Sequence, residues 1–220
     1  MIIKTEIVCF FEGLSPTSND YVHGSCDAAL KANGDTVKSY FIQPSLQHSP
    51  VSVKCQKFNS VAYAVFNHNN EAETRVTGQP DAAGGYKFQF VYPTPMETIV
   101  FVINQSSSCA QLTKATCLGV VFVGLGASWL NGRDGSKLRF WGGGPSNGTG
   151  CACGITNTCR DTTRKCNCDF NNNYGSEWTT DSGDVTAKDV LPLTGIAIGD
   201  TGTANVEVVK YTVGPLRCLI

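Results

Sequence analysis

The sequence has few charged residues, no long apolar run and only three histidines. Aspartate, glutamate, lysine and arginine together make up 16% of the 220 residues, and the formal net charge is −1. No basic run is longer than two residues, which argues against nucleic-acid binding driven by phosphate neutralisation. The longest apolar stretch, residues 118–127, contains three glycines. A membrane-spanning helix needs about 20 apolar residues, so no insertion into a membrane is expected.

The sequence also lacks a complete catalytic motif. Residues 144–148 match the Gly-x-Ser-x-Gly pattern of a nucleophile elbow, but that chemistry needs a downstream histidine as base. The last histidine is His68, far upstream of this serine. The glycine run at residues 142–144 has no following Gly-Lys-Ser/Thr, as a phosphate-binding loop would require. We therefore predict that the chain is not an enzyme.

Cysteine is abundant, and its spacing predicts the redox environment. Five of the 11 cysteines lie within residues 151–168. A structural zinc site is the alternative, but zinc ligands are usually spaced Cys-x-x-Cys and here no histidine follows His68. A disulfide framework also explains the scattered cysteines, so it is the favoured interpretation. The N-terminal residues do not resemble a signal peptide, because Lys4 and Glu6 interrupt the apolar segment. The cysteines nevertheless predict a secreted, extracellular protein.

The number of cysteines is odd, so one of them is free, bound to something small or paired between chains. Two Asn-x-Ser/Thr sequons, at Asn104 and Asn147, agree with secretion and are candidate glycosylation sites. Cys9 lies on a predicted N-terminal strand.

Local patterns predict a mixed α and β chain with many short antiparallel strands and about two helices. Ser25 is a good N-cap for a short helix that ends at the Asn-Gly pair of residues 33–34. A second helix is expected from Thr94 as N-cap, with Pro95 in the first turn and Glu97 closing a capping box. Strands are expected at residues 40–42, 51–55, 61–66, 86–92, 111–117, 120–123, 196–198 and 206–213. Residues 124–173 are expected to be long loops held by disulfides.

Candidate binding residues are few. Trp129, Trp141 and Trp178 lie among glycine, asparagine and arginine, where an indole stacks on a sugar ring or packs on a disulfide. Arg133 follows an Asn-Gly pair, so it either faces a partner or belongs to a plain turn. Asp181 and Asp184 are candidate calcium ligands, although the order of acids lacks EF-hand spacing and a turn explains Asp181-Ser-Gly equally well.

A set of motifs resembles the fibrinogen-like segment of the contactin-associated proteins, which are neurexin-related adhesion receptors. The similarity covers residues 25–218, and it is more distant to fibrinogen C-terminal domains and fibrillar-collagen C-terminal propeptides. The motifs are FNHNNEAETRV (66–76), CAQLTKATC (109–117), WLNGRDG (129–135), FWGGG (140–144), CACGITNTC (151–159), CNCD (166–169), EWTTDSGDV (177–185), DVLPLTGIAIGDTG (189–202) and VGPLRC (213–218).

The resemblance implies a disulfide-rich α+β fibrinogen-like domain with long loops. It implies an N-terminal extension, residues 1–24, and a domain over residues 25–218 that divides into residues 25–93 and a cysteine-rich part, residues 94–218. In the related families the equivalents of Cys26 and Cys55 are bonded to each other. The resemblance further implies that the remaining eight cysteines of the domain pair internally, namely Cys109, Cys117, Cys151, Cys153, Cys159, Cys166, Cys168 and Cys218. Cys9 lies outside the matched region and is then expected to be unpaired or to bond another chain.

The leading functional hypothesis is a secreted, non-enzymatic adhesion or matrix protein that contacts extracellular proteins or glycans and forms homo-oligomers through Cys9. The alternative is a carbohydrate-binding module that uses Arg133, Trp141 and Trp178, with calcium held by Asp181 and Asp184. A more remote alternative is a carrier of a small apolar ligand or pigment. Apart from calcium, no cofactor is expected.

Overall fold

The computed structural model describes residues 16–17, 20–171 and 176–220 of the chain. The strand expected around Cys9 lies outside these residues. The chain divides into two compact units, Met1–Ala62 and Tyr63–Ile220. Among the described residues, no helix is both long enough and apolar enough to cross a membrane.

The first unit is a short helix with three strands. Helix α1 (Cys26–Ala32) begins where Ser25 Oγ accepts a hydrogen bond from the Ala28 N–H, as its sequence predicts. Strand β1 (Val22–His23) is parallel to β2 (Lys38–Ile42), and β2 is antiparallel to β3 (Val51–Phe58). A disulfide between Cys26 and Cys55 joins α1 to β3, and this is the pair that the family resemblance implies.

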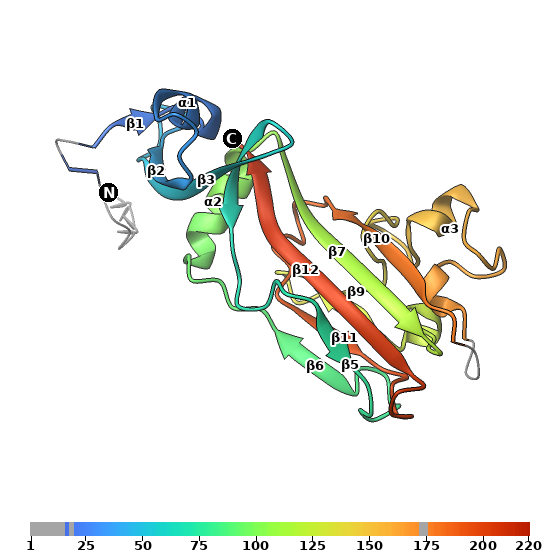
Figure 1. Ribbon diagram of the computed structural model, residues 1–220. Coiled ribbons are helices and arrows are strands. Elements are labelled where there is room, and N and C mark those ends of the chain that lie inside the picture. Colours follow the sequence, from blue (N-terminus) through green and yellow to red (C-terminus); the bar gives the residue numbers. More distant parts are fainter. Residues whose placement is uncertain (1–15, 18–19, 172–175) are drawn as a thin grey trace, which may run out of the picture. The chain divides into compact units, whose positions relative to one another are not determined.

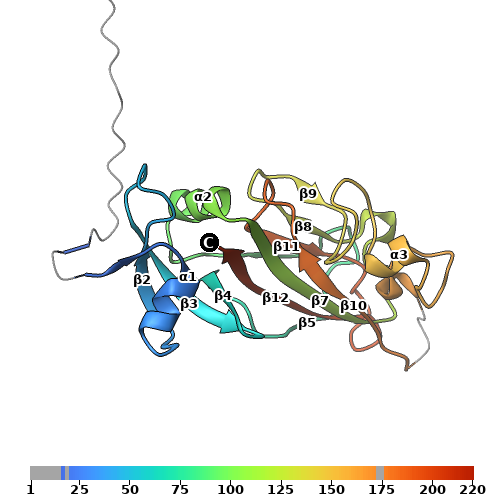
Figure 2. The same cartoon turned by 90° about the horizontal axis from the view of Figure 1, so that it is seen from above.

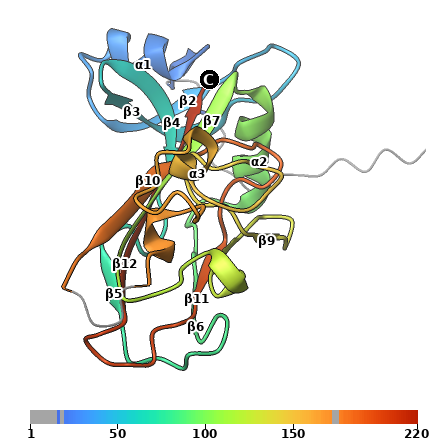
Figure 3. The ribbon, with the colours of Figure 1, turned by 90° about the vertical axis from the view of Figure 1, so that its right-hand side faces the viewer.

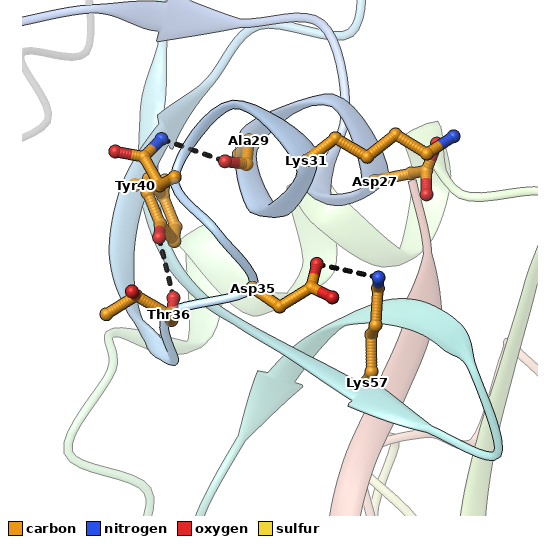
Figure 4. A network of polar contacts seen from close by, with 8 residues as sticks. Asp27, Ala29, Lys31, Asp35, Thr36, Tyr40 and Lys57 are labelled. Atoms are coloured by element: carbon orange, nitrogen blue, oxygen red, sulfur yellow. Dashed lines mark hydrogen bonds and ion pairs between the residues drawn. The ribbon is translucent and has the colours of Figure 1, made fainter.

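Polar contacts fix the turn that follows α1 (Figure 4). The Asn33 side chain donates to the Ala29 carbonyl oxygen over 2.8 Å and so caps the last turn of the helix. The Tyr40 hydroxyl donates to the Thr36 carbonyl oxygen over 2.6 Å. The Lys57 ammonium lies 2.6 Å from an Asp35 carboxylate oxygen. These contacts connect the turn to β2 and β3 on either side of it.

The second unit contains two sheets. Its larger sheet has the order β4 (Val61–Phe66), β12 (Val208–Leu219), β7 (Ser108–Leu118) and β10 (Thr179–Val185), and β5 (Thr74–Val76) also pairs with β12. All of these pairings are antiparallel, and β7, β12 and β10 are the long neighbouring arrows of Figure 1. The smaller sheet has the order β6 (Tyr86–Gln89), β11 (Gly195–Ile198), β8 (Trp129–Asn131) and β9 (Lys137–Leu138).

The smaller sheet and helix α2 (Met96–Gln105) lie on the same face of the larger sheet (Figures 2 and 3). Polar side chains connect these layers within an otherwise apolar core. The Tyr86 hydroxyl of β6 lies 3.1 Å from the Tyr211 hydroxyl of β12. Gln111 of β7 is fully buried, and its side chain donates to the Tyr92 hydroxyl and accepts from the Leu193 N–H. Because buried polar groups need hydrogen-bond partners, these bonds favour one alignment of the smaller sheet on the larger sheet.

Four disulfides hold the second unit together. One joins the facing strands β7 and β12, and the other three hold the segment of residues 150–171. This segment carries the short helix α3 (Ala152–Thr156) and the 3₁₀ turn η2 (Asn167–Asp169), whereas the other 3₁₀ turn, η1 (Gly124–Gly126), follows β7. The pairs are Cys109–Cys218, Cys117–Cys168, Cys151–Cys166 and Cys153–Cys159.

The described chain is mostly β with three α-helices and five disulfides, which agrees with the predicted disulfide-rich α+β class. The fibrinogen-like assignment stays a prediction. The expected strand at residues 120–123 is wrong, because this buried segment runs irregularly into η1. The capping box of Thr94 is also wrong. Helix α2 begins at Met96, and Pro95, with extended ψ, is its N-cap without any side-chain bond.

Candidate binding site

The outer face of the smaller sheet carries a hollow of about 430 Å³. This volume falls within the range of small-ligand sites, about 300–1,000 Å³. The hollow lies beside Gly195 of β11, which pairs with Gln89 of β6 and Asn131 of β8 in the register. Its lining residues are Lys87, Phe88, Gln89, Asn131, Gly135 and Thr194.

Strand alternation decides which side chains face this hollow. Tyr86 of β6 points inward and reaches Tyr211 of β12, so its neighbour Lys87 points outward. Leu130 and Ile196 are fully buried on the inner face. The residues that alternate with them therefore form the outer face, where Lys87, Gln89 and Asn131 line the hollow.

Asn131 forms one wall of the hollow, and Trp129 holds its side chain in place. The Trp129 indole N–H donates to Asn131 Oδ1 over 3.0 Å. This bond fixes the orientation of the Asn131 amide, because only its oxygen can accept. The amide nitrogen, Asn131 Nδ2, then lies over Gly195, 2.9 Å from where a side-chain carbon at that position would begin. The wall therefore presents an N–H₂ donor to the hollow.

The charges near the hollow are mainly positive. Lys87 lines it, and the Lys137 ammonium lies 4.2 Å from the centre of the Trp129 ring. Among the ion pairs of the described residues, none includes either lysine. Asp134, in the adjoining turn, accepts hydrogen bonds from the N–H and hydroxyl of Ser136, which lower the pKa of its carboxyl. The negative charge of Asp134 is therefore held by hydrogen bonds within its own turn.

Arg133, a predicted ligand-binding residue, is engaged within the protein. Its guanidinium donates to the carbonyl oxygens of Leu191 over 2.6 Å and of Asp189 over 2.9 Å, with a longer bond to that of Lys188. These bonds fasten the turn between β8 and β9 to the chain that precedes β11. The plain-turn interpretation of Arg133 therefore fits the structure better than exposure to a partner.

The two predicted tryptophans are not brought together. Trp141 is 1% exposed and packs edge-on against Phe122, so its ring does not offer a surface to a sugar. Trp178 is 41% exposed, and the Lys210 ammonium lies 4.7 Å from the centre of its ring. The tryptophan that lies beside a hollow is Trp129. Sequence patterns do not distinguish the three, because the hollow arises from strands far apart along the chain.

The predicted calcium pair is also not formed. Asp181 and Asp184 are three residues apart on β10, so their side chains leave opposite faces of the strand. Asp184 Oδ1 accepts from the Arg217 guanidinium over 3.0 Å. Asp181 is buried and accepts from the N–H groups of Cys168 over 2.7 Å and Asn167 over 3.1 Å. The alternative of a turn at Asp181 is wrong too, because the residue lies inside a strand.

Two buried aspartates instead hold the cysteine-rich loops. Asp169 accepts from the N–H groups of Val123 over 2.8 Å and Gly124 over 2.9 Å. Burial raises the pKa of Asp169, and burial likewise raises the pKa of Asp181, with a further contribution from the charge of Asp169. Each carboxylate satisfies N–H groups that would otherwise be buried without partners, which is a structural role.

Cys151, Cys166 and Asp181 place two sulfurs and a carboxylate within 4.8 Å of one another. Such a cluster has the composition of a metal site. However, the two sulfurs are bonded to each other as a disulfide, so neither is a thiolate ligand. The cluster is therefore part of the disulfide framework.

The sequons differ in their surroundings. Asn147 is exposed in a turn that is closed by a hydrogen bond from the Gly148 N–H to the Pro145 carbonyl oxygen. Asn104 is exposed near the end of α2, but Ser106 of the same sequon is buried and bonds the Val102 carbonyl oxygen. Glycosylation of both remains a prediction. Cys9 lies outside the described residues.

Comparison with known proteins found two informative relatives. Neurexin-4 of Drosophila melanogaster is 31% identical over 179 residues, which cover 77% of this chain and 14% of that protein. Contactin-associated protein 1 of Mus musculus is 31% identical over 201 residues, which cover 88% of this chain and 14% of that protein. The chain is related to one segment of these proteins. It spans about one seventh of their length. No family model matches the chain.

These matches support the resemblance to the neurexin and contactin-associated proteins that the motifs indicate. Together with the five disulfides, they indicate an extracellular location, because disulfides persist in oxidising compartments.

Proposed function

We propose that this chain is a non-enzymatic extracellular recognition domain in cell adhesion, and that it binds another extracellular protein. The observation that carries the proposal is the match of 88% of the chain to contactin-associated protein 1, whose name states an association with contactin. A contactin-like protein is accordingly the first partner to test. Secretion of the domain, and a place in the extracellular matrix, are parts of the same proposal.

The cysteine-rich segment is the surface that we assign to this partner. Its loops, residues 150–171, are held by three disulfides and by the buried carboxylates of Asp169 and Asp181. Loops that are already ordered lose little conformational entropy when they bind. Ile155 on α3 is 56% exposed and supplies an apolar anchor of the kind that protein interfaces bury.

A binding assay with a matched pair of variants tests this assignment. The oxidised chain is immobilised, and the extracellular part of a contactin is passed over it. We expect saturable binding that Ile155→Asp weakens at least tenfold. Val206→Asp changes an exposed apolar residue at 39% exposure in the loop before β12, and it should leave the affinity within about twofold. Absence of binding by the oxidised chain, or equal losses in both variants, would refute the assignment.

The alternative functions receive less support from the geometry. A calcium-dependent carbohydrate module built on Arg133, Trp141 and Trp178 would need these residues to converge, and they lie in separate environments. A carrier of an apolar ligand would need an enclosed apolar cavity, whereas the hollow over Gly195 is open and has a lysine, two amides and a threonine in its lining. Self-association through Cys9 is kept as a proposal and is tested in the Discussion.

A further inference from the structure

The hollow over Gly195 does not belong to the protein-binding surface proposed above, and its chemistry indicates a different ligand. Its floor strand, β11, is hydrogen-bonded to β6 on one side and to β8 on the other. No strand edge is therefore open at the floor, and an extended peptide could not add to the sheet there by main-chain bonds. Recognition in the hollow has to use side chains.

The side chains available are those that recognise hydroxyl groups. Gln89 extends from β6 on one side of Gly195, and Asn131 Nδ2 faces the hollow from β8 on the other. A carboxamide both donates and accepts, which matches a sugar hydroxyl that does the same. Thr194 adds a hydroxyl at the end of β11. The volume of the hollow, about 430 Å³, leaves room for a single sugar ring.

The charges select an acidic sugar over a neutral one. Lys87 lines the hollow, and Lys137 lies over the Trp129 ring beside it. Neither ammonium is in an ion pair within the described part of the chain. An anionic group of the ligand would therefore gain two cations without having to displace a protein carboxylate.

We propose that this hollow binds an acidic sugar residue without calcium. Lys87 pairs with the carboxylate or sulfate of the sugar, while Gln89 and Asn131 bond its hydroxyls. Lys137 adds positive potential at the rim and holds the Trp129 indole, whose N–H orients Asn131. Two natural sources share this chemistry, namely sialylated cell-surface glycans and sulfated uronic-acid polymers of the matrix.

The test measures the affinity of the oxidised full chain for 3′-sialyllactose, a heparin hexasaccharide and neutral lactose, each in EDTA. We expect at least one acidic probe to bind at least tenfold more tightly than lactose, and the better probe identifies the source. The side-chain amide resonances of Gln89 and Asn131, assigned from their alanine variants, should shift on titration. Weak binding of both acidic probes in EDTA, whether or not added calcium restores it, would overturn the proposal.

Matched charge reversals locate the site. Lys87→Glu should reduce the affinity for the acidic probe at least tenfold. Lys114→Glu makes the same charge change on an exposed residue of β7 in the larger sheet, and it should change the affinity less than twofold. Equal losses in the two variants would show non-specific attraction to positive charge and overturn the assignment. A protein-binding assay that succeeds while this one fails, or the reverse, separates this proposal from the function proposed above.

Discussion

At the scale of single residues, His68 is the histidine most closely enclosed by the core. Its ring packs against Phe90 and Tyr92, with centroids 4.6 and 5.5 Å away. Nε2 lies 3.2 Å from the Gly214 carbonyl oxygen, and Nδ1 accepts from the Asn70 N–H over 3.2 Å. This arrangement fits the neutral ring with its proton on Nε2. A second proton on Nδ1 would face the Asn70 N–H and break that bond.

Burial lowers the pKa of His68 below its usual value of 6.5, although the nearby carboxylate of Glu71 opposes the shift. The unfolded chain therefore binds more protons than the folded chain as the pH falls through 6.5. We expect the free energy of unfolding to decrease as the pH falls through this range. Below the pKa of His68 in the folded chain, His68 carries the proton in both states, and its contribution no longer changes with pH. Thermal unfolding between pH 7.5 and pH 5 measures the effect.

Two glutamine variants isolate the contribution of His68. His68→Gln should flatten the pH dependence of the unfolding temperature. His48→Gln replaces an exposed histidine and should leave that dependence in place. The comparison is needed because burial raises the pKa of Asp169, Asp181 and Asp200, and raised carboxyl pKa values act in the opposite direction. Parallel pH curves for the wild type and His68→Gln would show that this histidine contributes nothing.

At the scale of elements, the backbone of the FWGGG segment (residues 140–144) packs directly against the backbone of β10 at glycine residues. The Gly143 N–H donates to the Asp184 carbonyl oxygen over 3.0 Å, and the Gly142 N–H donates to Thr113 Oγ1 over 2.8 Å. A side-chain carbon on Gly183 would lie 2.5 Å from the Gly142 carbonyl oxygen and 2.8 Å from the Gly143 nitrogen. The two backbones meet directly, with no room for a methyl group between them.

We therefore expect Gly183→Ala to lower the free energy of unfolding by about 1–3 kcal/mol, because the atoms it would meet belong to the backbone and not to a flexible side chain. Denaturant unfolding checks this. Gly24→Ala is the control, since a carbon at that position meets nothing within 4 Å, and its effect should stay within about 0.5 kcal/mol. A Gly183→Ala chain as stable as the wild type would mean that the segment and β10 separate easily.

At the scale of the whole molecule, the disulfides take ten of the eleven cysteines and connect distant parts of each unit. Cys109 and Cys218 are directly opposite in the β7–β12 register and close a separation of 109 residues. Closing a loop of about that length stabilises a fold by up to about 4.7 kcal/mol in the chain-entropy account. Both sulfurs lie in residues that are 3% exposed or less, so a mild reductant should spare this bond.

We predict that Cys9 joins chains to one another, since the other cysteines are paired within the chain. Light scattering of the native protein should then give a multimer that falls toward 23.5 kDa in mild reductant. Cys9→Ser should have the lower mass without reductant. A chain that is monomeric before and after reduction would refute self-association through Cys9 and leave a monovalent recognition domain.

The sequence by itself determined the local elements and the chemical class of the chain. The N-cap at Ser25 and the alternating strands depend on residues only a few positions apart. The cysteine content depends on composition alone. The motifs likewise indicated the related proteins. Strands β8 and β9 are too short to show an alternating pattern, and β10 contains Asp-Ser-Gly, which is typical of a turn. Contacts between distant segments stabilise these three strands.

Only the tertiary structure decided which candidate residues act together. Trp141 lies in the core, and Arg133 donates hydrogen bonds to backbone carbonyl oxygens. Strand alternation places Asp181 and Asp184 on opposite faces of β10. The hollow over Gly195 is built from three strands that are adjacent in space and far apart in sequence. Sheet register, which depends on packing of the whole chain, places Asn131 and Gln89 on either side of one glycine. No local pattern contains that information.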